Sequence, residues 1–313
     1  MAGETASPGG AGPPFVSSRD LGSPHPIPAV IGVLFDGLAY GSLLFLVSLG
    51  LSVQMGLMNF VNLAHGAFAM AGGFVCVVAM SRFGVPFLAA LPIAFAAMAI
   101  AGAVLERFLY RRLYGASHLD QVLFSIGLTF MSIAAATYFF GASQQPVRLP
   151  AFLRGQVRLA GVDFGIYRIF LVAVVAVLTA ALAALVERTR FGAQVRAAVD
   201  DARAARGLGI DVDRVFTLAF ALGSGLAGLG GALGIEVLGL DSAFPLKFMV
   251  YFLLVVVVGG AGTLTGPLAA AMILGVCDVA GKYYIPQAGA FVIYAVMVVL
   301  LLAFPAGLRG RRR

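Results

Sequence analysis

The chain has 313 residues, of which 61% are hydrophobic and only 11% are charged. Soluble domains carry roughly 25% charged residues, so this composition excludes a water-covered globule and requires surrounding lipid. The net charge of +7 is better explained by arginines in cytoplasmic loops than by binding of nucleic acid, and we expect no nucleic-acid partner.

The chain divides into three parts. Residues 1–28 are rich in Pro, Gly and Ser and lack the basic start and apolar centre of a signal peptide, which predicts a disordered tail. Residues 29–308 form the predicted transmembrane domain. Residues 309–313 are mostly Arg and form a basic tail that we place in the cytoplasm.

Apolar segments of membrane-spanning or nearly membrane-spanning length recur along the domain, and they predict an all-α, polytopic transmembrane helical bundle with eight or nine spans. The segments are 29–55, 64–82, 86–106, 119–141, 167–186, 214–238, 245–260, 265–281 and 288–305. The glycine-rich stretch 259–267 is typical of a turn, so its two flanking segments fit either two short spans or one broken span. Nine spans place the N-terminus outside and eight place it inside.

Arginine-rich loops set the predicted orientation. Loops 107–118 and 187–214 and the C-terminal tail carry many arginines, so the positive-inside rule places all three in the cytoplasm. The stretch 142–166 then faces outward. It departs from the rule, because it holds Arg148, Arg154 and Arg158.

A polar stretch follows the first apolar segment. Asn59, Asn62 and His65 occur at three-residue spacing, with Gly66 next, and on one helix they would form a polar edge. Such an edge must face water or protein, because unpaired polar groups are costly in hydrocarbon. Two interpretations stay open: an unwound helix break of the kind that forms transport sites, or an interfacial turn in which Asn62 caps the next span.

The longest charged segment is 188–214. Residues 193–206 are Ala-rich and lack Pro and Gly, which predicts one short helix. Gly207 or Gly209 would end this helix in a left-handed conformation. Leu208 and Ile210 would supply apolar contacts. The segment fits either a helix that docks in a partner's groove or a solvated linker helix.

Glycine motifs in the spans do not indicate nucleotide binding. Residues 223–228 match G-x-G-x-x-G but follow no strand, and the glycines of 259–266 precede Pro267 where a phosphate-binding loop needs Lys. The repeat of small residues is typical of close helix packing: Ala219, Gly223, Ala227 and Gly231. Neither cysteine has metal-site spacing, so we predict no metal and no cofactor of the chain's own.

Two other functions stay open on the residues alone. An intramembrane enzyme would use His65 with Asn59 and Asn62, although no catalytic motif surrounds them. An ion-coupled secondary transporter would need intramembrane carboxylates. The candidates are Asp36, Glu236 and Asp278.

Several motifs, in this order, resemble the permease subunits of branched-chain amino acid ABC importers over residues 29–308. They are Asn62-Leu-Ala-His65-Gly66, Glu106-Arg107 with Tyr110-Arg111, Arg188-Thr-Arg-Phe-Gly192, Ala204-Ala205 with Gly209-Ile210, and Gly259–Pro267. The chain is more similar to the shorter of the two paired permeases. Ala67 stands where the family usually has an acidic or polar residue, so urea, short amides or other amino acids stay possible as substrates.

The resemblance implies an inward transporter in the bacterial inner membrane, and not an enzyme. The implied partners are a second permease, two ATP-binding subunits, an extracytoplasmic solute-binding protein and membrane lipid, with ATP bound by the partner subunits. It implies that the solute pathway includes Asn59, Asn62, His65 and Gly66. It implies that coupling to the ATPase involves Arg196, Asp200, Ala204, Ala205, Gly207, Gly209 and Ile210.

Overall fold

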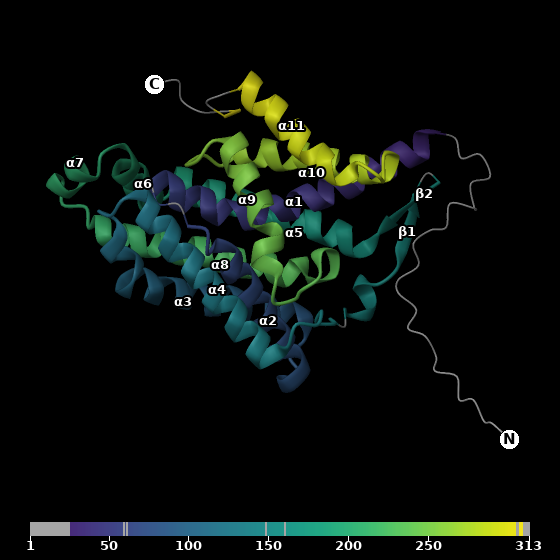
Figure 1. Cartoon of the computed structure of the whole chain (residues 1–313), viewed down its shortest axis with the longest axis horizontal. Coiled ribbons are helices and arrows are strands. Elements are labelled where there is room, and N and C mark those ends of the chain that lie inside the picture. Colours follow the sequence, from purple (N-terminus) through teal and green to yellow (C-terminus); the bar gives the residue numbers. More distant parts are fainter. Residues whose placement is uncertain are drawn as a thin grey trace.

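The computed structural model describes residues 26–58, 60, 62–147, 149–159, 161–304 and 307–308. Its elements, in chain order (Figure 1), are α1 (Pro26–Met58), α2 (His65–Phe83), α3 (Phe87–Phe108), the 3-10 turn η1 (Tyr110–Leu113), α4 (His118–Phe140), η2 (Ala151–Leu153), β1 (Gln156–Leu159), β2 (Val162–Gly165), α5 (Ile166–Arg188), α6 (Arg190–Asp200), α7 (Ala202–Gly207), α8 (Val212–Leu238), α9 (Phe244–Gly259), α10 (Thr265–Tyr284) and α11 (Gly289–Ala303). Residues 1–25 and 309–313 lie outside the described residues, so the predictions for the two tails stay predictions.

Every apolar segment that we predicted as a span is helical. Six helices have the length and apolarity of a membrane span: α1, α2, α3, α4, α5 and α8. The helices α9 and α11 contain 16 and 15 residues, or about 24 Å at 1.5 Å per residue, and are shorter than a hydrocarbon core of about 30 Å. The all-α transmembrane class is therefore confirmed, with six long candidate spans.

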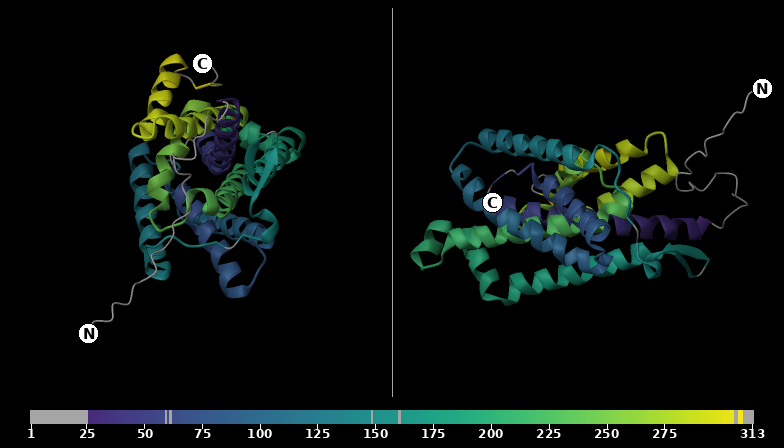
Figure 2. Two further views of the ribbon diagram at one scale, coloured as in Figure 1. Left: turned by 90° about the vertical axis from the view of Figure 1, so that its right-hand side faces the viewer. Right: turned by 90° about the horizontal axis from the view of Figure 1, so that it is seen from below.

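Helix α8 lies at the centre of the bundle. Within its most apolar window 83% of the residues are buried, against 17% for α4 and α5. Seen along the long axis of the molecule, α1 and α8 are surrounded by the other helices (Figure 2). The small residues of α8 make this packing possible, because a Cβ on Gly231 would lie 1.8 Å from the carbonyl oxygen of Ala69 in α2. The predicted packing role of the small-residue repeat is confirmed.

The glycine-rich stretch between α9 and α10 forms a turn, so two separate helices replace the single broken span that the sequence also allowed. Gly260 and Gly262 have φ values of 90° and 80°, a left-handed region that favours glycine. The Gly262 N–H donates to the Ser52 carbonyl at 3.1 Å, and this bond fixes the turn beside the end of α1.

One part of the described chain contains strands where the sequence suggested only a loop. The stretch 142–166, predicted as a loop, contains an antiparallel hairpin in which Val157 pairs with Phe164. The ring of Phe164 packs edge-on against Phe35 of α1, with 4.9 Å between the ring centroids.

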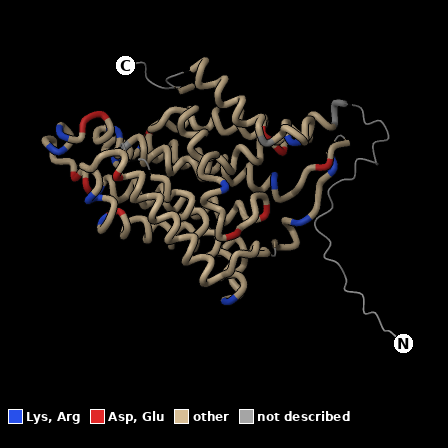
Figure 3. Tube along the Cα trace, viewed as in Figure 1, with Lys and Arg blue, Asp and Glu red and all other residues tan. Residues whose placement is uncertain are grey.

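Charged residues gather at the α6–α7 end of the molecule, and a second, looser group lies toward the hairpin end (Figure 3).

Candidate translocation and coupling sites

The described residues between α1 and α2 are not helical. Helix α1 ends at Met58 and α2 begins at His65, so Asn62 and His65 do not share one helix, and the predicted continuous polar edge is wrong for these two residues. Asn59 lies outside the described residues. Because Asn62–Ala64 turn before α2 starts, the two helices are interrupted here, as one of the two interpretations proposed, although Gly56 and Gly66 are themselves helical.

Asn62 organises this break through buried hydrogen bonds. Its Nδ2 donates to Gln54 Oε1 at 2.9 Å, and its Oδ1 accepts the N–H of Ala64 at 3.1 Å and the hydroxyl of Tyr110 at 3.0 Å. The Asn62 side chain is fully buried. Asn62 thus stabilises the turn before α2, as the capping interpretation expected, although the residue that directly precedes the helix is Ala64.

The break leads into the interior of the bundle and does not end at its surface. His65 Nε2 lies 2.8 Å from the carbonyl oxygen of Val47, which belongs to the middle of the α1 span. The hydroxyl of Thr129, within the α4 span, lies 3.4 Å from the carbonyl oxygen of Leu63. Helix α2 therefore starts at depth, which favours the unwound break over an interfacial turn.

The first turns of α2 and α9 meet at this depth. A Cβ on Gly66 would lie 3.1 Å from the Cα of Pro245, the second residue of α9. The Nδ1 atom of His65 is buried and has no hydrogen-bond partner among the described residues. This contact is not evident from the sequence, because Gly66 and the start of α9 at Phe244 lie far apart along the chain.

The charged segment differs from the single helix that we predicted for 193–206. It contains two helices, α6 and α7, with Asp201 between them in an extended conformation. The Asp201 carboxylate caps α7 by accepting the N–H groups of Arg203 and Ala204. These bonds favour the ionised form and lower the pKa of Asp201. Helix propensity did not predict the break at Asp201, because the Asp201 side chain binds backbone N–H groups that a continuous helix would use.

The predicted coupling residues separate into two groups. Five of them are exposed: Arg196, Asp200, Ala204, Gly207 and Gly209. Ala205 is buried against Ala198, Val212 and Val215, and Ile210 packs at the edge of this small apolar cluster. Gly209 has φ of 83°, so the left-handed end predicted for Gly207 or Gly209 is at Gly209.

A cavity that the sequence did not reveal lies between α6 and the bundle, with a volume of about 410 Å³. Its walls come from the C-terminal end of α1, from α5, α6 and α8, and from the turn before α10. Leu49, Leu222 and Leu226 form part of the apolar wall, and Arg196 and Asp200 bring a positive and a negative charge to the α6 side.

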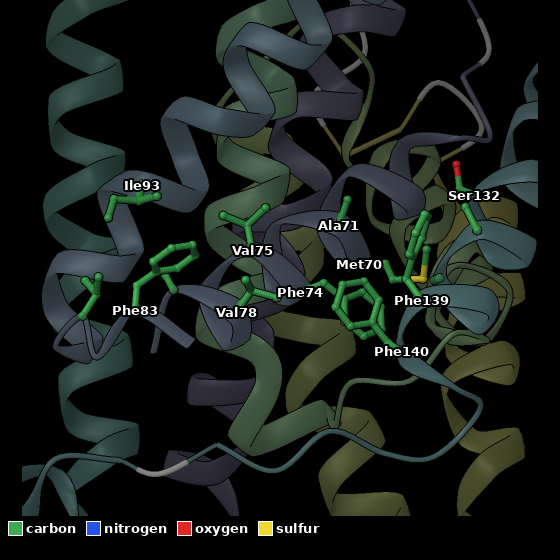
Figure 4. Close-up of a pocket in the computed structure, with 14 residues that line it drawn as sticks. Met70, Ala71, Phe74, Val75, Val78, Phe83, Ile93, Ser132, Phe139 and Phe140 are labelled. Atoms are coloured by element: carbon green, nitrogen blue, oxygen red, sulfur yellow. The ribbon is translucent and has the colours of Figure 1, made fainter. Parts of the chain in front are cut away.

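A larger apolar cavity of about 740 Å³ lies between α2 and α4 (Figure 4). Phe74 and Phe140 stack in its lining, with 4.2 Å between the ring centroids. Its Ser132 hydroxyl already donates to the Leu128 carbonyl at 2.8 Å. Because its lining offers no charged group, this cavity is a poor match for the ammonium and carboxylate groups of an amino acid.

Two of the three carboxylates that the sequence singled out, Asp36 and Asp278, have cationic partners, and the third, Glu236, is exposed. Asp278 in α10 is buried and pairs with Lys282 at 2.5 Å. Asp36 pairs with Arg168 at the start of α5. No group of three or more His, Cys, Asp or Glu residues suited to a metal ion occurs in the described part of the chain.

Sequence reasoning gave Glu106 no role beyond its place in a motif. Its carboxylate is fully buried at the end of α3 and accepts the hydroxyls of Tyr114 at 2.7 Å and Thr217 at 2.6 Å. Burial, followed by the hydrogen bond to Glu106, raises the pKa of Tyr114, and burial raises the pKa of Tyr110. Both hydroxyls therefore remain protonated donors at neutral pH.

Comparisons with known proteins agree with these features. The family described as "Branched-chain amino acid transport system / permease component" matches residues 33–301. Two curated relatives are named as high-affinity branched-chain amino acid transport system permease proteins. BraD of Pseudomonas aeruginosa is 26% identical, and the match covers 89% of this chain and 95% of BraD. LivH of Escherichia coli is 27% identical, and the match covers 89% of this chain and 94% of LivH.

A more distant organism, Methanocaldococcus jannaschii, has a probable branched-chain amino acid transport permease protein LivH that is 26% identical over 89% of this chain and 92% of the relative. No solved structure is significantly similar to the chain. Because the family match spans most of the helical bundle and the relatives match over nearly their full length, the chain belongs to the family of multi-pass membrane permeases of branched-chain amino acid ABC transport systems, and it is a transporter component, not an enzyme.

Proposed function

We propose that this permease carries branched-chain amino acids inward across the bacterial inner membrane as one of two paired permease subunits. Two ATP-binding subunits act from the cytoplasm, and an extracytoplasmic solute-binding protein delivers the solute. The names of the curated relatives support the substrate. The missing Lys after the glycines of 259–266 supports ATP binding by separate subunits.

The proposal includes nine crossings, with the N-terminus outside. Contacts at the ends of the helices support it: the turn before α10 bonds to Ser52 near the end of α1, and Leu308 bonds to Val258 near the end of α9. The ends of α1, α9 and α11 then share the cytoplasmic side with α6 and α7. Helices α2 and α9 begin in the interior, where Asn59, Asn62, His65 and Gly66 border the proposed pathway.

The observation that best supports the substrate is the mixed cavity beside α6. A branched-chain amino acid combines a small apolar side chain with an ammonium and a carboxylate. The cavity offers leucine-lined walls together with Asp200 and Arg196, which have the charges that attract these two groups. Its volume of about 410 Å³ falls within the range of small-molecule sites. We assign it as the inner end of the pathway.

A tryptophan scan at two positions of α8 tests this assignment. Leu222 lines the cavity, whereas Leu218, one turn earlier, is 56% exposed and lies outside it. Leu222→Trp should reduce uptake of labelled leucine by at least about tenfold, because it fills the space for the substrate. Leu218→Trp should transport normally. Equal uptake by the two variants in reconstituted vesicles, or uptake of urea in place of leucine by the wild-type protein, would refute the assignment.

The exposed face of α6 and α7 is the proposed docking surface for the ATP-binding subunits. Leu208, at the tip after α7, is 81% exposed, and an apolar tip on a charged helix pair suits a partner's groove. Leu208→Asp should abolish copurification of those subunits while the permease stays folded. The matched control is Leu159→Asp at the opposite end, where Leu159 is 57% exposed. Normal copurification with Leu208→Asp would exclude this docking surface.

A further inference from the structure

A polar network around the buried carboxylate of Glu106 joins the end of α3 to the start of α8. The fully buried Glu106 carboxylate accepts hydroxyls from Tyr114 and Thr217, and Arg111 Nε lies 3.5 Å from it. A carboxylate removed from water is costly unless charged and hydrogen-bonding partners surround it. These contacts supply such partners and hold η1, α3 and α8 in one fixed arrangement.

The network continues from Arg111 to the coupling segment. Arg111 Nη2 donates to the Thr217 hydroxyl at 2.9 Å and to the Asp213 carbonyl at 3.2 Å. The Asp213 carboxylate, in the first turn of α8, accepts Arg206 of α7 at 2.9 Å. We call these residues the Glu106 network: Glu106, Arg111, Tyr114, Thr217, Asp213 and Arg206.

The 3-10 turn that carries Arg111 also reaches the break before α2. Tyr110 is fully buried, and its hydroxyl donates to Asn62. Its ring packs against Phe60, Phe124 and Phe220, with centroid separations of 5.2, 5.3 and 4.7 Å. Because aromatic rings surround Tyr110, a displacement of η1 has to move the Asn62 side chain and the turn it stabilises.

We propose that the Glu106 network and Tyr110 transmit the position of α7 to the unwound break at Asn62, so that movement of the coupling segment moves the start of α2. This inference rests on the proposed transport function. It assigns Arg206, Asp213, Arg111, Glu106 and Tyr110 as positioning residues, which act on the pathway through Asn62.

The contacts of α7 explain why polar residues carry this connection. Helix α7 makes apolar contacts with the rest of the protein through the small cluster around Ala205. The side chains of Arg203, Arg206 and Leu208 are exposed. Small apolar contacts are non-directional and permit sliding. Charge-assisted hydrogen bonds fix both distance and direction, so the Glu106 network defines where α7 lies relative to η1.

The test measures leucine uptake and ATP hydrolysis in the same vesicles, using the complete importer. Arg206→Ala and Tyr110→Phe act at opposite ends of the connection. Each should lower the number of solutes moved per ATP by roughly tenfold, a typical size for coupling between sites, with little change in ATP hydrolysis or melting temperature. Matched controls are Arg158→Ala, which breaks an exposed ion pair with Asp163 in the hairpin, and Tyr138→Phe on the exposed face of α4, and both should keep the wild-type ratio.

The double variant Arg206→Ala with Tyr110→Phe distinguishes one connected network from two separate defects. If the residues act in series, the double variant is no worse than the poorer single variant. Independent effects would instead multiply. Arg206→Lys, which keeps the charge, should restore much of the transport ratio.

Three results would overturn the inference: an unchanged ratio in the single variants, multiplied losses in the double variant, or parallel loss of uptake, ATP hydrolysis and melting temperature, which indicates a purely structural role. A wild-type importer with no ATP-dependent uptake would refute the proposed function itself. If the wild-type importer and the variants all move the same number of solutes per ATP hydrolysed, this inference alone would be refuted.

Discussion

Helices α8 and α4 are both apolar and long enough to cross a membrane, yet they differ in nearly every contact. The most apolar window of α8 is 83% buried, and that of α4 is 17% buried. On α8, Gly231 and Gly228 approach the backbone of α2, whereas nothing lies within 4 Å of a Cβ added to Gly127 of α4. Hydropathy alone therefore does not separate a central helix from a peripheral one. The spacing of small residues does.

The largest expected effect comes from adding one methyl group to each helix. Gly231→Ala places a Cβ 1.8 Å from the Ala69 carbonyl oxygen, so the helices must separate, at a cost of at least about 3 kcal/mol. Gly127→Ala on α4 should be neutral or stabilise by up to about 1 kcal/mol. Melting temperatures of the two purified variants check this contrast. Similar values for both would show that α8 is not the central packing helix.

A smaller effect is expected from removing one hydroxyl beside each helix. Tyr167 of α5 is buried, and its hydroxyl donates to the Leu233 carbonyl of α8 at 2.6 Å. Tyr167→Phe should destabilise the protein by about 1 kcal/mol, the net value of a typical hydrogen bond. Tyr138 on α4 is 84% exposed, so Tyr138→Phe should leave the melting temperature unchanged. A larger loss at Tyr138 would place α4 in a buried interface.

The smallest effect is expected at Ser224 of α8, and its sign is the informative part. The Ser224 hydroxyl is buried and has no hydrogen-bond partner among the described residues. Ser224→Ala should be neutral or stabilise by up to about 1 kcal/mol, because it removes an unsatisfied polar group. Ser132→Ala on α4 serves as the comparison. Clear destabilisation by Ser224→Ala in thermal unfolding would indicate that a buried partner holds this hydroxyl.

The sequence predicted the helices well because their determinants are local. The segments 119–141 and 167–186 agree closely with α4 and α5, since apolarity and length decide where a chain can cross hydrocarbon. The charged segment 188–214 is helical as predicted, although it contains two short helices in place of one. The break at Asp201 and the hairpin at 156–165 were missed, because each depends on a few specific hydrogen bonds in a stretch with no strong periodicity.

The candidate sites were only partly predictable. Asn62 and His65 stood out because polar groups are rare in the spans of this chain, whereas the proposed coupling residues follow from the resemblance of the segment 196–210 to the coupling loop of the family. Glu106 and Tyr110 did not stand out, since their importance comes from partners such as Thr217 and Asn62 that are distant in sequence.

The sequence by itself determined that this protein is an apolar helical membrane permease with one long charged segment, because composition, span length and local motifs carry that information. Only the tertiary structure decided the depth at which α2 begins, the cavity beside α6 and the burial of Glu106. Each of these features depends on contacts between helices that are far apart in the sequence. Such contacts are determined by side-chain shape and by the pairing of charged groups, which local sequence patterns do not reveal.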